Sequence, residues 1–347
     1  MTTPPLDERS REVLRSVIQL HVATGEPVGS ESLARALGRT LSSATLRSTM
    51  AELEKKGYLD HPHTSAGRLP TDEGYRVYVD SLMSLAPLPA RDAAAIESEL
   101  RTGDGSPSQV MEAASQVLSR HSGKVGFVLV PGVSRTTLRH VDLVRLPYPR
   151  ILAVMVSLTG LVTHRIIEVE DEMSQEDLQA CANYLNTHFS GLGLEAIRRH
   201  LLELMQQEKA LYDSLLKNVV SVGGRAFSEG GEADVYLDGA SRLLDAPELA
   251  DLDRMRGLFK TFEEKGRLVK ILNACLSKEG VRITIGHENP DPDLRQVAVV
   301  TASVALEPDA SWGLGVMGST RMEYARMISL VEHVARALNQ ALKELRS

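Results

Sequence analysis

A short run of residues near the amino terminus combines hydroxyl and guanidinium side chains at a spacing suited to contacts with DNA. Ser42, Ser43 and Thr45 lie at the expected start of a helix, where hydroxyls and free backbone N–H groups can hold phosphates. Arg47 follows two residues after Thr45, and its planar donor fork can hydrogen-bond a guanine bidentately. These residues predict recognition of double-stranded DNA.

The apolar residues of this helix, expected over residues 44–56, determine which side chains face outward. Leu46, Met50 and Leu53 recur at helical spacing and are expected to face a core. The residues on or near the opposite side are small or basic, so the helix backbone can lie deep in a major groove. They are Ala44, Arg47, Ser48, Ala51 and Lys55.

The segments on either side complete the order of a winged helix-turn-helix. Apolar periodicity predicts earlier helices over Leu6–Thr24 and Glu31–Leu37, and a later helix over Asp72–Leu85. Before the later helix, two short apolar segments flank a polar stretch with Pro and Gly, which predicts two strands joined by a wing. His63 and Arg68 lie in this wing, where they can contact phosphates or the adjacent minor groove.

The charge of this region differs from that of the whole chain. The 347 residues include 39 Lys and Arg against 46 Asp and Glu, for a net charge of -7. From Arg35 to Arg68, however, six basic residues stand against three acidic ones. The net charge argues against a protein that coats nucleic acid by bulk attraction, but a local basic face remains available for DNA.

Composition and cysteine count argue against several other classes. With 4% aromatic residues, the chain is a poor candidate for single-strand binding by stacking. It has neither an apolar run of about 18 residues nor an apolar leader, so we expect no membrane span and a cytoplasmic location. Cys181 and Cys275 are too few for a disulfide framework or a four-cysteine zinc site, and we expect two buried thiols.

No catalytic, metal or cofactor site emerges from the remaining polar residues. His61 and His63 would share a strand face, but no third ligand is apparent nearby, so wing residues near phosphates are the favoured interpretation. Gly313–Gly318 matches G-x-G-x-x-G, yet almost only a helix follows, so a Gly-rich turn between strand and helix is favoured over a dinucleotide site. No nucleophile and base occur in a recognisable motif, which argues against an enzyme.

The rest of the chain predicts an α+β domain interrupted by a mostly helical insertion. Pro87 and Pro89 indicate a boundary after residues 1–86. Apolar runs predict strands over 125–130, 138–146, 151–158, 161–169, 281–286 and 296–306, and helices over 174–189, 194–222, 249–276 and 321–345. We expect a hairpin turn at 157–160, and we expect the last helix to cover the sheet rather than form an interface. The predicted division is a helical linker over 87–122, the α+β domain over 123–200 and 277–347, and the insertion over 201–276.

Several motifs of this sequence resemble signatures of the heat-inducible transcription repressor HrcA family. The most specific is Pro62-His63-Thr64-Ser65-Ala66-Gly67-Arg68-Leu69-Pro70-Thr71, followed by Gly74-Tyr75-Arg76. The resemblance spans nearly the whole chain. The other matching stretches are Thr24–Ser30, Leu41–Arg47, Met50–Glu54, Ile285–Asn289 and Gly318–Tyr324.

The resemblance implies a dimeric repressor with a winged-helix domain, a GAF-like domain and a dimerising insertion. Such a repressor is expected to bind an inverted-repeat operator upstream of chaperone operons and to depend on the chaperonin GroEL for activity. On this basis we assign the dimer contact to an apolar stripe in the insertion, although core packing would explain the same pattern. The stripe contains Leu252, Met255, Phe259 and Phe262.

Two residues depart from the family pattern, and one alternative function stays open. Ser48 stands where the family usually has Asn, and Ser319 where it usually has Pro. Because Ser reads a base edge less specifically than Asn, the half-site sequence is open. The alternative is a metabolite-sensing winged-helix regulator that acts through its GAF-like domain.

Overall fold

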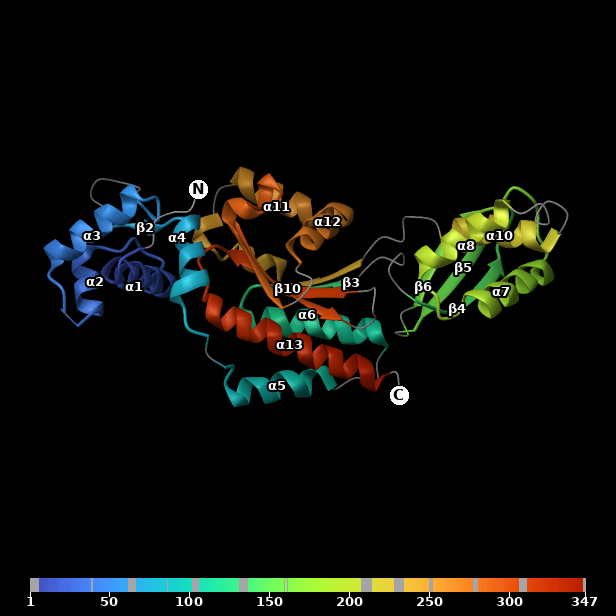
Figure 1. The fold of residues 1–347 in the computed structure, drawn as a ribbon, viewed down its shortest axis with the longest axis horizontal. Coiled ribbons are helices and arrows are strands. Elements are labelled where there is room, and N and C mark those ends of the chain that lie inside the picture. Colours follow the sequence, from blue (N-terminus) through green and yellow to red (C-terminus); the bar gives the residue numbers. More distant parts are fainter. Residues whose placement is uncertain are drawn as a thin grey trace.

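The computed structural model shows an elongated chain in which three bodies lie in a row (Figure 1). An amino-terminal body and a third body flank a central one. Among the residues described, no helix combines the length and apolar character that crossing a membrane requires. The described residues are 6–38, 40–61, 67–85, 87–101, 106–130, 137–158, 160, 162–206, 214–227, 234–249, 252–276, 280–305 and 311–345.

The amino-terminal body contains three helices, a two-stranded antiparallel sheet and a fourth helix. Asp7 caps the first helix by accepting a backbone N–H at 2.8 Å, and Gly25 ends it in the left-handed region. Leu14, Leu46 and Leu53 are fully buried where the helices meet. The elements are α1 (Glu8–Thr24), α2 (Ser30–Ala36), α3 (Ser43–Lys55), β1 (Leu59–Asp60), β2 (Leu69–Pro70), α4 (Asp72–Val77) and the π-helix η1 (Tyr78–Leu82). The predicted helices and strand pair are confirmed, with the fourth helix divided between α4 and η1.

The central body is built around a five-stranded antiparallel sheet with the order β7-β3-β10-β9-β8. Alternate residues of β3 point to opposite layers: Val128 packs with α6 and α13, whereas Phe127 packs with α12. The last helix therefore covers the sheet, as predicted (Figure 1). The bounds are α5 (Ala90–Arg101), α6 (Pro107–Ser122), β3 (Val125–Val130), β7 (Asp234–Asp238), η3 (Ala240–Leu243), η4 (Pro247–Leu249), α11 (Leu252–Glu263), α12 (Lys265–Cys275), β8 (Val281–Ile285), η5 (Gly286–Glu288), η6 (Pro292–Leu294), β9 (Val297–Ala305), β10 (Ser311–Ser319) and α13 (Tyr324–Glu344).

The third body is a three-stranded antiparallel meander covered on one face by helices. Gly160 adopts φ 80° and donates its N–H to the carbonyl of Ser157 at 2.9 Å, which confirms the predicted hairpin turn. Leu143, Leu178 and Leu185 are buried between sheet and helices. The elements are β4 (Leu138–Arg145), β5 (Arg150–Ser157), β6 (Val162–Glu168), α7 (Gln175–Phe189), α8 (Leu194–Gln206) and α10 (Ser214–Ala226).

The strands divide into two sheets, which differs from the single interrupted α+β domain predicted for 123–200 and 277–347. Strands β4, β5 and β6 pair with their neighbours in sequence and so form a sheet of their own. In contrast, β7, α11 and α12, which fall in the predicted insertion over 201–276, pack into the central body. Strand β7 pairs with β3, with Tyr236 opposite Val128. The segment inserted into the central body is therefore 137–227.

Two predicted helices are divided. The helix predicted over 194–222 corresponds to α8 and α10, and residues 207–213 between them lie outside the described residues. The helix predicted over 249–276 is broken at Glu264, whose ψ of 74° is not helical. After this break α12 packs against β3, β7 and β8, whereas α11 packs against α12 and η6.

The glycines of the G-x-G-x-x-G match are part of a central strand, not of a turn between strand and helix. Gly315 lies in β10, opposite Phe127 of β3 and Thr301 of β9. A Cβ at Gly315 would overlap the backbone oxygen of Val300, so only glycine permits this approach. The glycine spacing reflects strand packing.

Candidate nucleic-acid interface

Helix α3 presents to solvent three of the residues that the sequence assigned to DNA contacts. Leu46 and Leu53 are fully buried and hold the helix against the core. Arg47, Ser48 and Lys55 are exposed on the other side. Within the described part of the chain, Arg47 and Lys55 form no ion pair, so both charges are available to an anionic partner.

The hydroxyls at the start of α3 are fixed by hydrogen bonds. Ser42 caps the helix, because its Oγ accepts the backbone N–H of Thr45 at 3.1 Å. The hydroxyls of Ser42 and Thr45 also lie 2.8 Å apart. Ser43 is half-buried, with its Oγ 3.0 Å from that of Ser30 on α2. Ser42 is the exposed member of the set and remains open to a phosphate.

Arg68 is held by the protein itself, which limits its role as a free arm. Its Nε donates to Oε2 of Glu54 at 2.7 Å, and its side chain is only 18% exposed. Its backbone forms a bridge with Val28, with both N–O distances at 2.9 Å. Arg68 therefore ties the second strand to α3 and to the segment before α2. His63, the other predicted wing residue, lies outside the described residues.

The amino-terminal body is joined to the central body through α4. The hydroxyl of Thr71, the residue before α4, donates to the carbonyl of Gly57 just beyond α3, at 2.6 Å. Asp72 in turn accepts hydrogen bonds from His287 of η5, from the backbone N–H at 2.9 Å and from Nδ1 at 2.5 Å. Two hydrogen-bonded contacts, Thr71–Gly57 and Asp72–His287, therefore connect the end of α3 to the central body through the start of α4.

Arg76 and Glu288 form a bidentate charged contact at this junction. The Arg76 guanidinium pairs with both oxygens of Glu288, with the Nε–Oε1 distance at 2.7 Å, and donates to the carbonyl of Ile283 at 2.8 Å. Burial raises the pKa of Glu288, but hydrogen bonds from Arg76 and from the Ile285 N–H outweigh this, so the pKa lies below its ordinary value. The carboxylate stays charged at neutral pH.

An aromatic pair and a second arginine complete the junction. The rings of Tyr75 and Tyr324 lie 5.8 Å apart between centroids, and both side chains are buried. Arg321 donates to the carbonyl of Val22 in α1 at 3.2 Å and pairs with Glu248. Tyr75, Arg321 and Tyr324 lie in stretches that resemble family signatures, but no pattern in the sequence predicted their contacts. The available signal in the sequence for this junction was that charged residues lie beside these two tyrosines.

The other predicted residues are placed as follows. Met255 and Phe262 of the apolar stripe pack partly against the core of the central body, and the Phe259 and Phe262 rings meet edge to face at 6.3 Å. Nothing is described of the Leu252 side chain. Cys181 and Cys275 are buried, and burial raises the pKa of Cys181 to about 11, which fits packed thiols. Among the described residues, no His, Cys, Asp or Glu cluster suits a metal ion.

Comparison with known proteins extends this picture over the whole chain. Residues 108–328 match the family model described as HrcA protein C terminal domain. Heat-inducible transcription repressors HrcA of Geobacter sulfurreducens and Syntrophobacter fumaroxidans are 38% and 37% identical, over 97% and 98% of this chain and 98% of each relative. A crystal structure described as a hypothetical protein matches with a TM-score of 0.63 at 21% identity, covering 98% of this chain and 100% of that one. This last likeness concerns the fold alone.

The family model and the relatives define a transcription regulator, a class that acts by binding DNA and not by catalysis. The chain belongs to the HrcA family, whose relatives reported above are heat-inducible transcription repressors.

Proposed function

We propose that the protein is a homodimeric repressor that binds an inverted-repeat operator of heat-shock chaperone operons in the cytoplasm. The observation that carries this proposal is the outward face of α3, where Arg47 has no partner among the described residues and Ser48 beside it is small. In this proposal, α3 enters the major groove, Arg47 contacts a base, and Ser42 and Lys55 contact phosphates. Ser43 and Thr45 orient the start of the helix, and His63 contacts the backbone from the wing.

The domain roles follow from the three bodies. We assign a winged-helix DNA-binding domain to the amino-terminal body and a GAF-like domain to the central body. The third body is the dimerising insertion. We therefore move the dimerising role from the predicted insertion over 201–276 to the third body. The reason is that Met255 and Phe262 of the predicted stripe already pack against the core of the central body.

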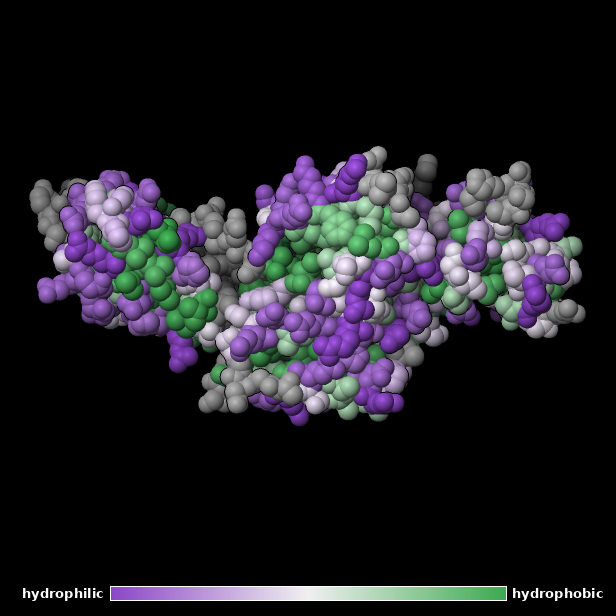
Figure 2. Space-filling model, turned by 180° about the vertical axis from the view of Figure 1, so that it is seen from behind, coloured by the Kyte–Doolittle hydropathy of each residue, from purple (hydrophilic) through white to green (hydrophobic). Residues whose placement is uncertain are grey.

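The uncovered face of β4–β6 is the surface that we propose for the dimer. Val144, Val162 and Ile166 are 39%, 59% and 56% exposed there, although all three are apolar. Leu152 of β5 lies between Val144 and Ile166 in the pairing register, so a continuous apolar row crosses the sheet. Figure 2 shows hydrophobic side chains gathered on this body. A symmetric dimer would match the symmetry of an inverted repeat.

A charge substitution on this face tests the dimer. Ile166→Lys is expected to convert the protein to a monomer in sedimentation velocity and to weaken operator binding. Leu202→Lys is the matched control, because Leu202 is 59% exposed on α8, away from that face. A dimer that survives Ile166→Lys would refute the assignment.

The chaperonin dependence implied by the family has a thermodynamic basis in this proposal. GroEL would raise the population of the folded, operator-competent repressor. Heat would divert the chaperonin to unfolded clients, lower that population and release the operon. Repression itself would be steric, because the dimer would occupy promoter DNA.

The decisive experiment is an anisotropy titration with the inverted repeat of the family and with a scrambled duplex, at one salt concentration, with and without GroEL. A preference of about a thousandfold or more for the inverted repeat is expected, and a dependence on GroEL would support the switch. Equal binding to both duplexes in the presence of GroEL would refute sequence-specific repression by this site. The alternative function, a metabolite-sensing regulator, requires a ligand site in the central body. One cavity of that body could serve as this site.

A further inference from the structure

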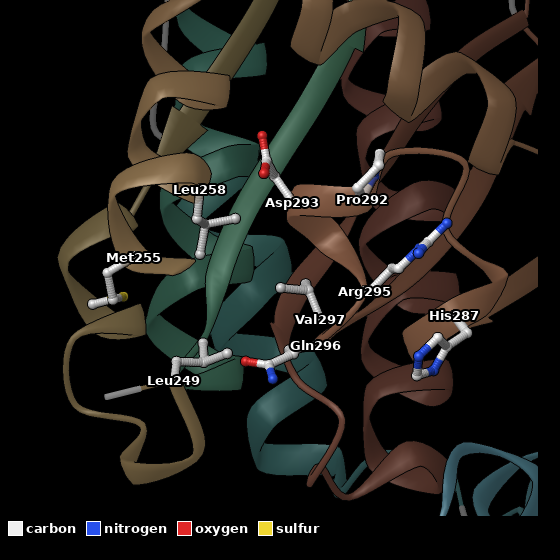
Figure 3. A pocket seen from close by; sticks show the side chains of 9 residues that line it. All are labelled: Leu249, Met255, Leu258, His287, Pro292, Asp293, Arg295, Gln296 and Val297. Carbon is white, nitrogen blue, oxygen red and sulfur yellow. The ribbon is translucent and has the colours of Figure 1, made fainter. Parts of the chain in front are cut away.

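A cavity of about 340 Å³ lies between helix α11 and the segment that joins β8 to β9. One wall is apolar. It is formed by Leu249, Met255, Leu258 and Val297, of which all but Met255 are almost fully buried. Figure 3 shows Leu249, Met255 and Leu258 on one side of this space, with His287 and Arg295 on the opposite side. Such a volume is sufficient for a small organic molecule.

The other wall is polar and carries unused hydrogen-bonding capacity. Gln296 extends between Leu249 and Val297 (Figure 3), and its buried Oε1 has no hydrogen-bond partner in the described structure. A buried acceptor without a partner costs free energy, which a ligand donor would recover. The lining therefore favours an occupant that has both an apolar body and a donor group.

The charge of this wall favours an anion. Arg295 is exposed at the cavity and, within the described ranges, has no ion pair. The one carboxylate in the lining, Asp293, is already paired with Arg267, at 2.8 Å between Oδ2 and Nη2. An unpaired guanidinium beside an apolar surface is the usual receptor for a carboxylate with an apolar body.

The cavity also shares a residue with the junction between the bodies. His287 lines the cavity and donates both its backbone N–H and its Nδ1–H to Asp72 of α4. Through Thr71 and Gly57, the same helix is attached to the end of α3. A molecule in the cavity would therefore contact His287, whose hydrogen bonds to Asp72 help to position the amino-terminal body.

We propose that this cavity binds a small apolar carboxylate that also carries a hydrogen-bond donor. The carboxylate pairs with Arg295, the donor reaches Gln296, and the apolar body packs on Leu258 and Val297. Occupancy changes the His287–Asp72 contact and with it the operator affinity, a consequence that rests on the proposed function. Ligand binding itself does not depend on that function.

Titration calorimetry of the full chain tests the site directly. The probes are indole-3-acetate, 4-hydroxyphenylacetate and 10-hydroxydecanoate, each with a carboxylate, an apolar body and a donor. At least one is expected to bind with a Kd below about 1 mM. Indole-3-acetamide, which lacks the charge, and 1-naphthaleneacetate, which lacks the donor, are expected to bind more weakly than indole-3-acetate. Failure of all three acids to bind at that level would overturn the proposal.

Substitutions then locate the bound probe. Arg295→Ala and Gln296→Leu are each expected to weaken binding about tenfold or more. Arg336→Ala is the matched control, since Arg336 is an exposed arginine of α13 outside the cavity. Circular dichroism confirms that each variant folds. Equal affinity of the wild type and the Arg295 and Gln296 variants would place the probe elsewhere and refute the site. If binding follows these residues but the operator preference is absent, the site stands and the proposed function fails.

Discussion

Asp72 accepts two hydrogen bonds from His287, a residue 215 positions away in the sequence, with its Oδ2 at 2.9 Å from the backbone nitrogen and 2.5 Å from Nδ1. This contact places the first turn of α4 against η5 of the central body. Arg76 repeats the connection one turn later through Glu288. Because Thr71 joins the same helix to the end of α3, we expect the orientation of the amino-terminal body to depend on these pairs.

Gly286 makes the Asp72–His287 contact sterically possible. Its φ is 53°, and a Cβ at this position would overlap the carboxylate of Asp72. We expect Gly286→Ala to lower the free energy of unfolding by about 1 to 3 kcal/mol, measured by urea denaturation. Gly280→Ala is the control, because Gly280 has a similar φ of 70° but no described atom within 4 Å of its Cβ position. Equal losses in the two variants would mean that backbone strain alone, without the overlap with Asp72, explains the effect.

The Arg76–Glu288 pair is expected to contribute a coupling energy that acid removes. A double-mutant cycle with Arg76→Ala and Glu288→Ala is expected to give about 1 kcal/mol at neutral pH, measured by urea unfolding. The folded-state pKa of Glu288 lies below the ordinary value of 4.5, so its contribution is complete above that pH and is lost as the pH falls through the lower value. The exposed pair Lys217–Asp171 is the control and is expected to give less. Additive effects at neutral pH would show that the two residues do not act together.

His21 is expected to weaken the fold in mild acid. It is 7% exposed on α1, and burial lowers the pKa of its imidazole despite the hydrogen bond from Nδ1 to the Glu26 carbonyl at 3.0 Å. Below the ordinary value of 6.5 the unfolded chain binds the extra proton, so stability falls as pH falls, by at most about 1.4 kcal/mol per pH unit for one group. His21→Asn keeps a donor for Glu26 but does not titrate. Melting temperatures at pH 7.5 and 5.5 should therefore differ less in this variant than in the wild type, and an unchanged difference would assign the effect to other groups.

The sequence was sufficient for the amino-terminal body because its signals are local. Gly25 and Ser42 mark helix ends, and Leu46 and Leu53 identify the buried side of α3, which leaves Arg47 outward. Sheet membership was not predicted in this way, although β3 is buried along its whole length and β4 has buried and exposed residues mixed. The partners of β3 are β7 and β10, both beyond the complete third body, and no local pattern specifies such distant pairings.

The limits of the site prediction have the same origin. The sequence placed Arg68 in the wing, but its ion pair with Glu54 depends on how α3 packs beside β2. Of the junction residues, His287 was recognised only as part of a family motif and Asp72 only as the first residue of a predicted helix, since their contact spans two bodies. Local chemistry identified the face that would meet DNA, whereas tertiary packing determines what holds that face in place.

Ser42 separates a structural role from a DNA contact. Removal of its cap in Ser42→Ala is expected to cost about 1 kcal/mol of stability, because the N–H of Thr45 loses its acceptor. Ser42→Asp retains an acceptor and is expected to keep the stability, but its charge at the proposed phosphate site would weaken binding to any duplex. Urea unfolding and anisotropy on the same two variants measure both effects. If Ser42→Asp bound DNA as tightly as the wild type, the phosphate contact would be wrong.

In the proposed function, Arg47 is the residue on which sequence-specific recognition most depends. It is exposed, lies on the side of α3 opposite Leu46 and Leu53, and has no ion pair in the described structure. Arg47→Ala is expected to cost about 1 to 3 kcal/mol of operator affinity and to relax discrimination at one base position in each half-site. Anisotropy titrations on the inverted repeat, on single-base variants and on a scrambled duplex measure this loss. Lys55→Ala is the comparison, because loss of a phosphate contact should weaken all duplexes similarly and reduce the salt dependence. An Arg47→Ala variant that behaves like Lys55→Ala would make Arg47 a phosphate contact and would move base recognition to another residue of α3.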